Sequence, residues 1–267
     1  MANLPESQDK NLYTPDPTKR RGIYILPNLF TTASLFAGFY AIVAAMNHEY
    51  QTAAIAIFVA MIFDGLDGRV ARLINAQSPF GAEYDSLSDM LAFGVTPALV
   101  MYNWALQSLA EDGFGKVGWL TAFLYVACVA LRLARFNTQV DHSGEAKRYF
   151  SGLPCPSAAA FIASLVWVGN IYHVQGMWVS LLALVFTIFV SVMMVSSIPY
   201  RSFKDIDLKG KIRFTALVVI VLIAICISIS PAHLLLVVFA LYVFSGPAVA
   251  LWNLRGKKTL TKTEPKL

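Results

Sequence analysis

Long apolar segments recur along this chain and constrain its fold more than any other feature. The first, Ile23–Met46, runs for 24 residues without an aspartate, glutamate, lysine or arginine. A helix needs about 20 such residues to cross the hydrocarbon core of a bilayer. The whole sequence is 57% hydrophobic and only 14% charged, whereas soluble domains carry about 25% charged residues. Because backbone groups in lipid must be hydrogen-bonded within the protein, we expect an all-α, polytopic membrane helix bundle.

Hydropathy and turn residues divide the chain into about eight predicted transmembrane helices. They fall near residues 23–46, 50–75, 85–108, 117–139, 156–173, 176–198, 212–230 and 233–253. We expect one membrane domain over residues 22–254, between a flexible cytoplasmic N-terminal tail (1–21) and a basic cytoplasmic C-terminal tail (255–267). The N-terminal tail does not resemble a signal peptide, because the apolar stretch that follows it is too long.

The distribution of basic residues predicts the orientation of these helices. With both termini in the cytoplasm, nearly every lysine and arginine falls on the inner side, and only Lys116 lies outside. The formal net charge of +5 therefore reports topology rather than nucleic-acid binding, and we expect the same residues to attract anionic membrane lipids. The longer, motif-rich loops are also on the inner side. We expect an active site that faces the cytoplasm, and the lack of a targeting peptide favours a bacterial inner membrane.

Four aspartates interrupt the apolar pattern where the second and third segments meet. They are Asp64, Asp67, Asp85 and Asp89. An ionised carboxylate at membrane depth is costly unless it is paired, hydrated or bound to a cation. The apolar run Ala53–Phe63 reaches only about 16 Å as a helix, so the second helix must continue through the first two aspartates to span the bilayer. Salt bridges for packing are the alternative, but Arg69 and Arg72 cannot neutralise four acids.

Helical spacing predicts that these carboxylates come together. One arc of about 100° on the second helix carries Asp64, Asp67, Gly68 and Ala71. Asp85 and Asp89 share a face of the third segment at spacing i, i+4, and Ser78–Gly81 is expected to turn the chain between the two helices. Four oxygen donors favour Mg²⁺, Mn²⁺ or Ca²⁺ over zinc. Four carboxylates can also hold two ions that clamp a phosphoryl group.

The residues from Asp64 to Asp89 resemble the signature of the CDP-alcohol phosphotransferase family. All eight fixed positions and every interval match the pattern D-x2-D-G-x2-A-R-x8-G-x3-D-x3-D. The resemblance implies a helical membrane enzyme, commonly homodimeric, that moves a phosphatidyl or similar group from a CDP-linked donor to an alcohol and releases CMP. It implies that the four aspartates hold two divalent ions and that Asp89 is also the general base. It assigns contacts with the CDP-lipid to Gly68, Ala71, Arg72 and Ser78.

A second resemblance lies at the start of the first helix, where residues 27–31 read PNLFT. This stretch resembles the PN-x-x-T motif of the same family, which lies close to the nucleotide. It adds Asn28 and Thr31 to the predicted CDP-lipid contacts. An ordinary helix start with a proline and a polar cap is the alternative reading.

Two later stretches limit the choice of acceptor alcohol. Residues 132–137 read RLARFN, and residues 152–156 read GLPCP. Together they are similar to integral-membrane phosphatidylserine synthases, which implies transfer from CDP-diacylglycerol to L-serine. Arg132 and Arg135 suit the serine carboxylate, and Asn137 adds a neutral donor and acceptor. Anchoring of the arginines at the membrane interface is the alternative for this pair, and GLPCP also suits a tight helix start.

Two alternative functions remain open from the sequence. In the first, the enzyme would catalyse the same transfer but use glycerol phosphate, inositol phosphate or choline as the acceptor. A divalent-cation transporter would use the aspartates as a transport site, but it would need them near mid-membrane with access from both faces. Direct attack by serine is favoured over a phosphatidyl-enzyme, because Ser86 and Ser88 do not share the face of Asp85 and Asp89. The three cysteines, which show no pairing pattern, are expected to be apolar packing residues.

Overall fold

The computed structural model of the protein describes residues 25–74, 78–110, 113–140, 149–201 and 230–260. The predicted helix near 212–230 lies outside these ranges apart from its last residue, and so does the whole N-terminal tail 1–21. The boundary predicted between residues 254 and 255 falls inside the last described helix. These parts of the predicted organisation therefore stay predictions.

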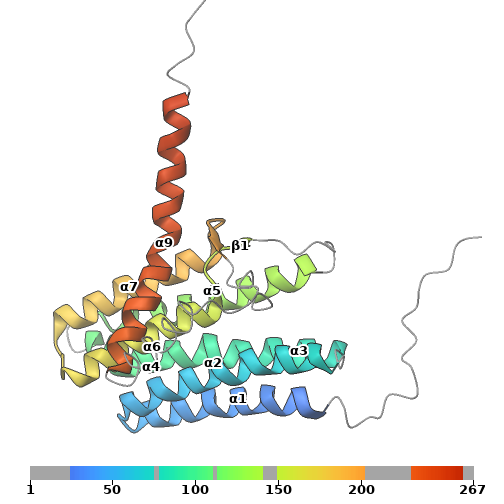
Figure 1. Cartoon of the computed structure of the whole chain (residues 1–267). Coiled ribbons are helices and arrows are strands. Elements are labelled where there is room, and N and C mark those ends of the chain that lie inside the picture. Colours follow the sequence, from blue (N-terminus) through green and yellow to red (C-terminus); the bar gives the residue numbers. More distant parts are fainter. Residues whose placement is uncertain (1–24, 75–77, 111–112, 141–148, 202–229, 261–267) are drawn as a thin grey trace, which may run out of the picture.

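The described residues form a bundle of helices with one short ribbon of strands (Figure 1). The helices are α1 (Ile25–Met46), α2 (Tyr50–Leu73), α3 (Pro79–Asp89), α4 (Thr96–Trp104), α5 (Gly115–Val140), α6 (Cys155–Ile171), α7 (Met177–Val195) and α9 (Pro231–Leu260). A π-helical segment, η2 (Met90–Val95), separates α3 from α4, and a 3₁₀ helix, η3 (Leu106–Ala110), follows α4. The ribbon pairs β1 (Tyr149–Ser151) antiparallel with β2 (Pro199–Arg201). The expected helix bundle is confirmed, although the sequence did not predict the ribbon.

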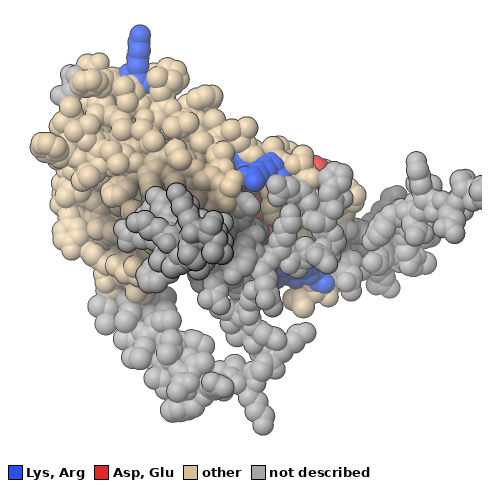
Figure 2. All heavy atoms as spheres, turned by 90° about the horizontal axis from the view of Figure 1, so that it is seen from above, with Lys and Arg blue, Asp and Glu red and all other residues tan. Residues whose placement is uncertain are grey.

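Four of the described helices are long and apolar enough to cross a membrane. They are α1, residues 115–138 of α5, α7 and residues 231–250 of α9. Large apolar side chains on them point outward, including Phe36, Phe123 and Trp178, which are exposed by 70%, 61% and 81%. Figure 2 shows a broad outer surface with few charged side chains. A surface of this kind suits contact with lipid rather than water, so the chain is an integral membrane protein. The total of eight spans stays a prediction.

The third predicted segment differs most from the structure. Its helix begins at Pro79 rather than near Asp85 and ends at Trp104 rather than at 108. Ser78 caps α3 by accepting a hydrogen bond of 3.0 Å from the backbone N–H of Gly81, and proline at the first helical position is already suited to a helix start. The same residues that predict a turn therefore also start the helix, which places Asp85 in its interior.

Small residues bring α1 close to its neighbours and so position the site. Ala41 and Ala45 of α1 are fully buried, as are Ala53 and Ala54 of α2. A β-carbon on Gly38 would lie 3.0 Å from the Cα atom of Ala92 in η2. Close helix approach through small side chains is typical of membrane bundles. It lets α1 lie alongside α2 and also contact α3 (Figure 1).

Candidate functional site

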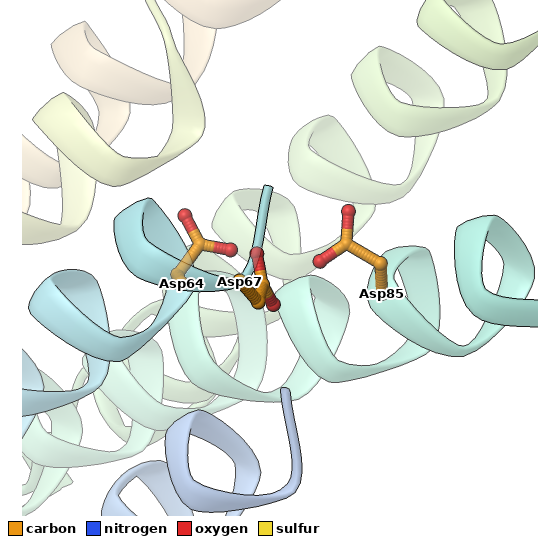
Figure 3. A group of neighbouring side chains, drawn as sticks. All are labelled: Asp64, Asp67 and Asp85. Atoms are coloured by element: carbon orange, nitrogen blue, oxygen red, sulfur yellow. The ribbon is translucent and has the colours of Figure 1, made fainter. Parts of the chain in front are cut away.

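Three of the predicted acids converge at the junction of α2 and α3. One carboxylate oxygen from each of Asp64, Asp67 and Asp85 lies within 4.8 Å of the others. Figure 3 shows their side chains directed toward a common space. α2 supplies the first two from positions three residues apart, which share a helix face, and α3 supplies the third. The structure thus brings together acids that are 21 residues apart in the sequence.

Asp89 lies on the same side of α3, one helical turn beyond Asp85, and its carboxylate is a direct neighbour of Asp64. One oxygen of Asp89 and one of Asp85, in each case Oδ1, is buried without a hydrogen-bond partner among the described residues. Buried carboxylate oxygens without partners are rare and costly. Four neighbouring acids also repel one another, so a bound cation would both satisfy these oxygens and offset the repulsion.

The chemistry of this donor set fits a hard divalent cation. Carboxylate oxygens are the ligands preferred by Mg²⁺, Mn²⁺ and Ca²⁺. Arg69 and Arg72 are exposed, and within the described ranges no ion pair joins either of them to the four aspartates. The alternative in which these arginines neutralise the acids therefore finds no support in the structure.

A pocket of about 280 Å³ opens beside the aspartates. It is lined by Pro27, Asn28, Thr31, Asp67, Gly68, Ala71, Arg72, Ser78, Gly81, Ala82 and Asp85. These include all six residues that the sequence assigns to the CDP-lipid, drawn from α1, α2 and the start of α3. The volume is near the lower end for small-molecule sites, so it suits a headgroup better than acyl chains. That the six residues bind a CDP-lipid stays a prediction.

Gly68 gives this pocket its open wall. A β-carbon built at this position would meet no atom within 4 Å, so packing inside the protein does not require a glycine here. Glycine costs about 1 kcal/mol relative to alanine inside a helix. A ligand that approaches the α2 backbone closely would explain why a glycine is present despite this cost, as the sequence predicts.

The helix α1 reaches the acids through one buried threonine. The hydroxyl of Thr31 donates a hydrogen bond of 2.8 Å to Oδ2 of Asp67. The backbone carbonyl of Thr31 accepts a hydrogen bond of 3.1 Å from the hydroxyl of Ser88, next to Asp89. Neither contact could be predicted from the sequence, because both join segments that are far apart along the chain.

Residues predicted to bind serine approach the acids from another side. Asn137 of α5 donates from Nδ2 to the hydroxyl of Ser86 on α3, at 3.1 Å. Arg132 contacts the side chain of Cys155 at the start of α6, and Asp89 acts on that same thiol through its charge. The structure therefore places Asn137 against α3, which contains Asp89, and Arg132 beside a thiol that the charge of Asp89 also influences. Arg135 is exposed on α5.

Two residues near Arg132 were missed as site residues in the sequence. Cys155 was predicted to be an apolar packing residue, and it is indeed 3% exposed, but its thiol also contacts Arg132 and lies near enough to Asp89 to be influenced by its charge. Tyr242 of α9 lies close enough to Arg132 for the guanidinium charge to act on its phenol group. The position of Cys155 inside the GLPCP stretch was the available signal, whereas nothing in the sequence singled out Tyr242.

Comparison with known proteins gives the same picture. The model of a family described as CDP-alcohol phosphatidyltransferase matches residues 24–189. The CDP-diacylglycerol–serine O-phosphatidyltransferase of Helicobacter pylori (strain ATCC 700392 / 26695) is 38% identical over 224 residues, which cover 84% of this chain and 90% of that protein. The protein of the same name from Mycobacterium tuberculosis (strain ATCC 25618 / H37Rv) is 37% identical over 237 residues, 86% of this chain and 80% of the relative.

A relative from an archaeon bears a different name. The archaetidylserine synthase of Methanothermobacter thermautotrophicus is 36% identical over 177 residues, which cover 66% of this chain and 69% of that protein. The names of all three relatives refer to a serine-containing lipid product or a serine substrate. The region matched by the family model contains the four aspartates and the pocket residues.

Proposed function

This chain belongs to the CDP-alcohol phosphatidyltransferase family, and we propose that it transfers a phosphatidyl group from CDP-diacylglycerol to L-serine. The resemblance seen in the sequence is thereby confirmed, and the protein is a membrane transferase rather than a cation transporter. The observation that carries the proposal is the convergence of the aspartates beside a pocket lined by α1, α2 and α3. Relatives that span most of this chain and bear the serine-specific name support the choice of acceptor.

The donor would bind with its CDP group in the pocket and its acyl chains in the bilayer. Arg72 borders the pocket and offers a guanidinium group that suits a phosphate. Gly68 and Ala71 leave the α2 backbone open to the nucleotide. Ser78 and Asn28 add polar groups to the lining of the pocket. Because these residues come from three helices, the pocket forms only when the helices pack together.

Asp64, Asp67, Asp85 and Asp89 would hold two divalent ions, with Mg²⁺ or Mn²⁺ the expected species and Ca²⁺ also possible from the donor set. When bound, such ions supply positive charge that offsets the charge of the diphosphate and of the leaving CMP. The unpartnered oxygens of Asp85 and Asp89 support this assignment.

The transfer itself needs one proton acceptor and one oriented alcohol. The serine hydroxyl oxygen forms a bond with the lipid phosphorus as the bond from phosphorus to the CMP oxygen breaks. Asp89 accepts the hydroxyl proton, and CMP leaves with the electron pair of the broken bond. Arg132 would bind the carboxylate of the serine substrate, and Asn137 would help to position the same substrate. Phosphatidylserine and CMP are the products.

A single displacement is the simplest course for this reaction. The hydroxyl of Ser88 donates to the Thr31 carbonyl and is 2% exposed. The hydroxyl of Ser86 donates to the Ala82 carbonyl at 3.1 Å and accepts from Asn137. Both serines are therefore engaged in packing contacts, which supports direct attack by the substrate over a phosphatidyl-enzyme.

A labelled-acceptor assay tests the proposal. Purified protein in detergent would receive CDP-diacylglycerol, Mn²⁺ or Mg²⁺, and in parallel reactions labelled L-serine, glycerol phosphate, inositol phosphate or choline. We expect labelled lipid and an equal amount of CMP with serine, and loss of both when the ions are chelated. Faster transfer to any other alcohol would overturn serine as the acceptor but would leave the family chemistry intact.

The cellular setting completes the proposal. The positive-inside pattern supports an active site that opens to the cytoplasm. The two relatives above come from Helicobacter pylori and Mycobacterium tuberculosis, which supports a bacterial origin and hence the cytoplasmic membrane as the location. Homodimer formation is implied only by the family resemblance and stays a prediction, as does attraction of anionic lipids by the basic inner loops. Crosslinking in native membranes would test the dimer.

A further inference from the structure

We propose that Thr31 is a positioning residue that holds Asp67 ready as a metal ligand. The inference rests on the proposed function, because it takes the aspartates to be the site of a divalent cation. The sequence resemblance assigns Thr31 instead to the CDP-lipid. The structure separates these two roles, since the hydroxyl of Thr31 points to a carboxylate rather than only to the pocket.

The hydroxyl of Thr31 has a single proton and can donate it fully to only one acceptor. Two acceptors lie within reach: Oδ2 of Asp67 at 2.8 Å and the backbone carbonyl of Pro27 at 3.2 Å. A hydrogen bond to an ionised acceptor is roughly twice as strong as one between neutral groups. The Pro27 carbonyl, one turn earlier in α1, is also the acceptor that the helix offers to the backbone N–H of Thr31. The shorter contact to the carboxylate therefore prevails.

The hydrogen bond between Thr31 and Asp67 is buried. Thr31 is 3% exposed and Asp67 is 6% exposed, so water has little access to replace a lost donor. The hydroxyl occupies one acceptor site of the Asp67 carboxylate and leaves the others for a cation. It also restrains the side-chain rotation that would carry Asp67 away from Asp64 and Asp85. Hydrogen-bond partners that hold metal ligands in this way typically contribute about 10- to 100-fold in metal affinity.

Thr31 also links the pair of acids on α2 to the pair on α3. Thr31 is bonded on both sides, through its hydroxyl to Asp67 on α2 and through its carbonyl to Ser88 on α3. Ser88 is 2% exposed and directly precedes Asp89. One residue of α1 thus fixes the position of the α2 acids relative to the α3 acids, which is the spacing that a shared cation site requires.

Direct measurement of Mn²⁺ binding tests this role without any transfer reaction. Free Mn²⁺ would be titrated by electron paramagnetic resonance in the presence of the purified full-length protein in detergent. Thr31→Val keeps the shape of the side chain and removes the hydroxyl, and we expect its Kd for Mn²⁺ to rise about 10- to 100-fold. Thr31→Ser keeps the hydroxyl, and we expect it to stay close to the wild type.

Ser34→Ala is the matched control. The hydroxyl of Ser34 joins α1 to α2 by donating to the Ala60 carbonyl at 3.0 Å, and the residue is 2% exposed. Its loss removes one buried bond between the same two helices without touching a carboxylate. We expect lower thermal stability but an unchanged Kd for Mn²⁺. If Thr31→Val does not fold, the comparison of Thr31→Ser with Thr31→Ala isolates the hydroxyl in the same way.

The outcomes separate the inference from the proposed function. A wild-type Kd for Mn²⁺ in Thr31→Val, with a raised KM for CDP-diacylglycerol, would overturn the inference and return Thr31 to the nucleotide. An equal loss of Mn²⁺ affinity in Ser34→Ala would also overturn it, because helix packing alone would then explain the effect. If the wild-type protein bound no Mn²⁺ at all, both the inference and the proposed metal site would be wrong.

Discussion

The hydroxyl of Tyr125 in α5 donates a hydrogen bond of 3.1 Å to the backbone carbonyl of Phe93 in η2. In a regular α-helix this carbonyl would accept from the backbone N–H of residue 97, but residue 97 is a proline and has none. Both Tyr125 and Phe93 are fully buried, so water cannot serve as the donor. The tyrosine therefore supports the π-helical segment that begins directly after Asp89, in keeping with the frequent occurrence of such segments at functional sites.

Removal of that hydroxyl should weaken the fold. We expect Tyr125→Phe to lower the free energy of unfolding by about 0.5–1.5 kcal/mol, because it removes the hydrogen bond of a side-chain donor to a buried carbonyl. Thermal unfolding in detergent would measure the change. Tyr40→Phe is the control, since Tyr40 is 46% exposed on α1. Equal stability of the two variants would contradict the role given to Tyr125.

Asp89 should be needed for turnover more than for donor binding. Asp89→Asn removes the proton acceptor and leaves the pocket walls, so we expect kcat to fall by at least about 100-fold. Binding of CDP-diacylglycerol, measured by calorimetry, should change little, because Asp89 does not line the pocket. Retained turnover would show that another group takes the serine proton.

Loss of the Arg132 side chain should weaken the use of serine more than the use of CDP-diacylglycerol. We expect Arg132→Ala to raise the KM for serine by about 10-fold or more, as for the loss of a hydrogen bond to a charged group, and to alter the KM for CDP-diacylglycerol far less. Arg135→Ala is the matched control on the same helix, because the exposed Arg135 should matter less. Parallel titrations of both substrates would decide the point, and an equal rise in both KM values would argue against a serine contact.

The open wall at Gly68 offers a steric test of the pocket. Gly65 and Gly68 both lie in α2, and a β-carbon at either would meet no atom within 4 Å, but only Gly68 lines the pocket. Leucine at either position should gain a similar helix propensity. We therefore expect Gly68→Leu to raise the KM for CDP-diacylglycerol and Gly65→Leu to leave it nearly unchanged. The reverse order would place the CDP group elsewhere.

A second tyrosine repeats the relationship seen at Phe93 and shows how the ribbon joins the bundle. Tyr200 of β2 donates to the carbonyl of Val243 in α9 at 3.0 Å, where Pro247 lacks the N–H that would otherwise bond there. A β-carbon on Gly246 would collide with the ring of Tyr200. The sequence contained all these residues, but their pairing depends on a strand that it did not predict.

The class of fold and the chemical composition of the site could be predicted from residues that are close together along the chain. Uncharged runs long enough to span a bilayer predict membrane helices, and the spacings of Asp64 with Asp67 and of Asp85 with Asp89 place each pair on one helix face. These are local properties, set by a helical period that every residue in the segment shares. The family resemblance rests on the same local pattern.

Contacts between groups from distant segments become visible only in the packed helices. Thr31 reaches Asp67 across 36 positions, Asn137 reaches Ser86 across 51, and the thiol of Cys155 is influenced by both Arg132 and Asp89. Such contacts depend on how closely whole helices approach and on their rotation about their axes, which small buried residues such as Gly38 and Ala41 set by packing. Periodicity along one helix has no information about the partner that faces it, so these relationships had to come from the packed bundle.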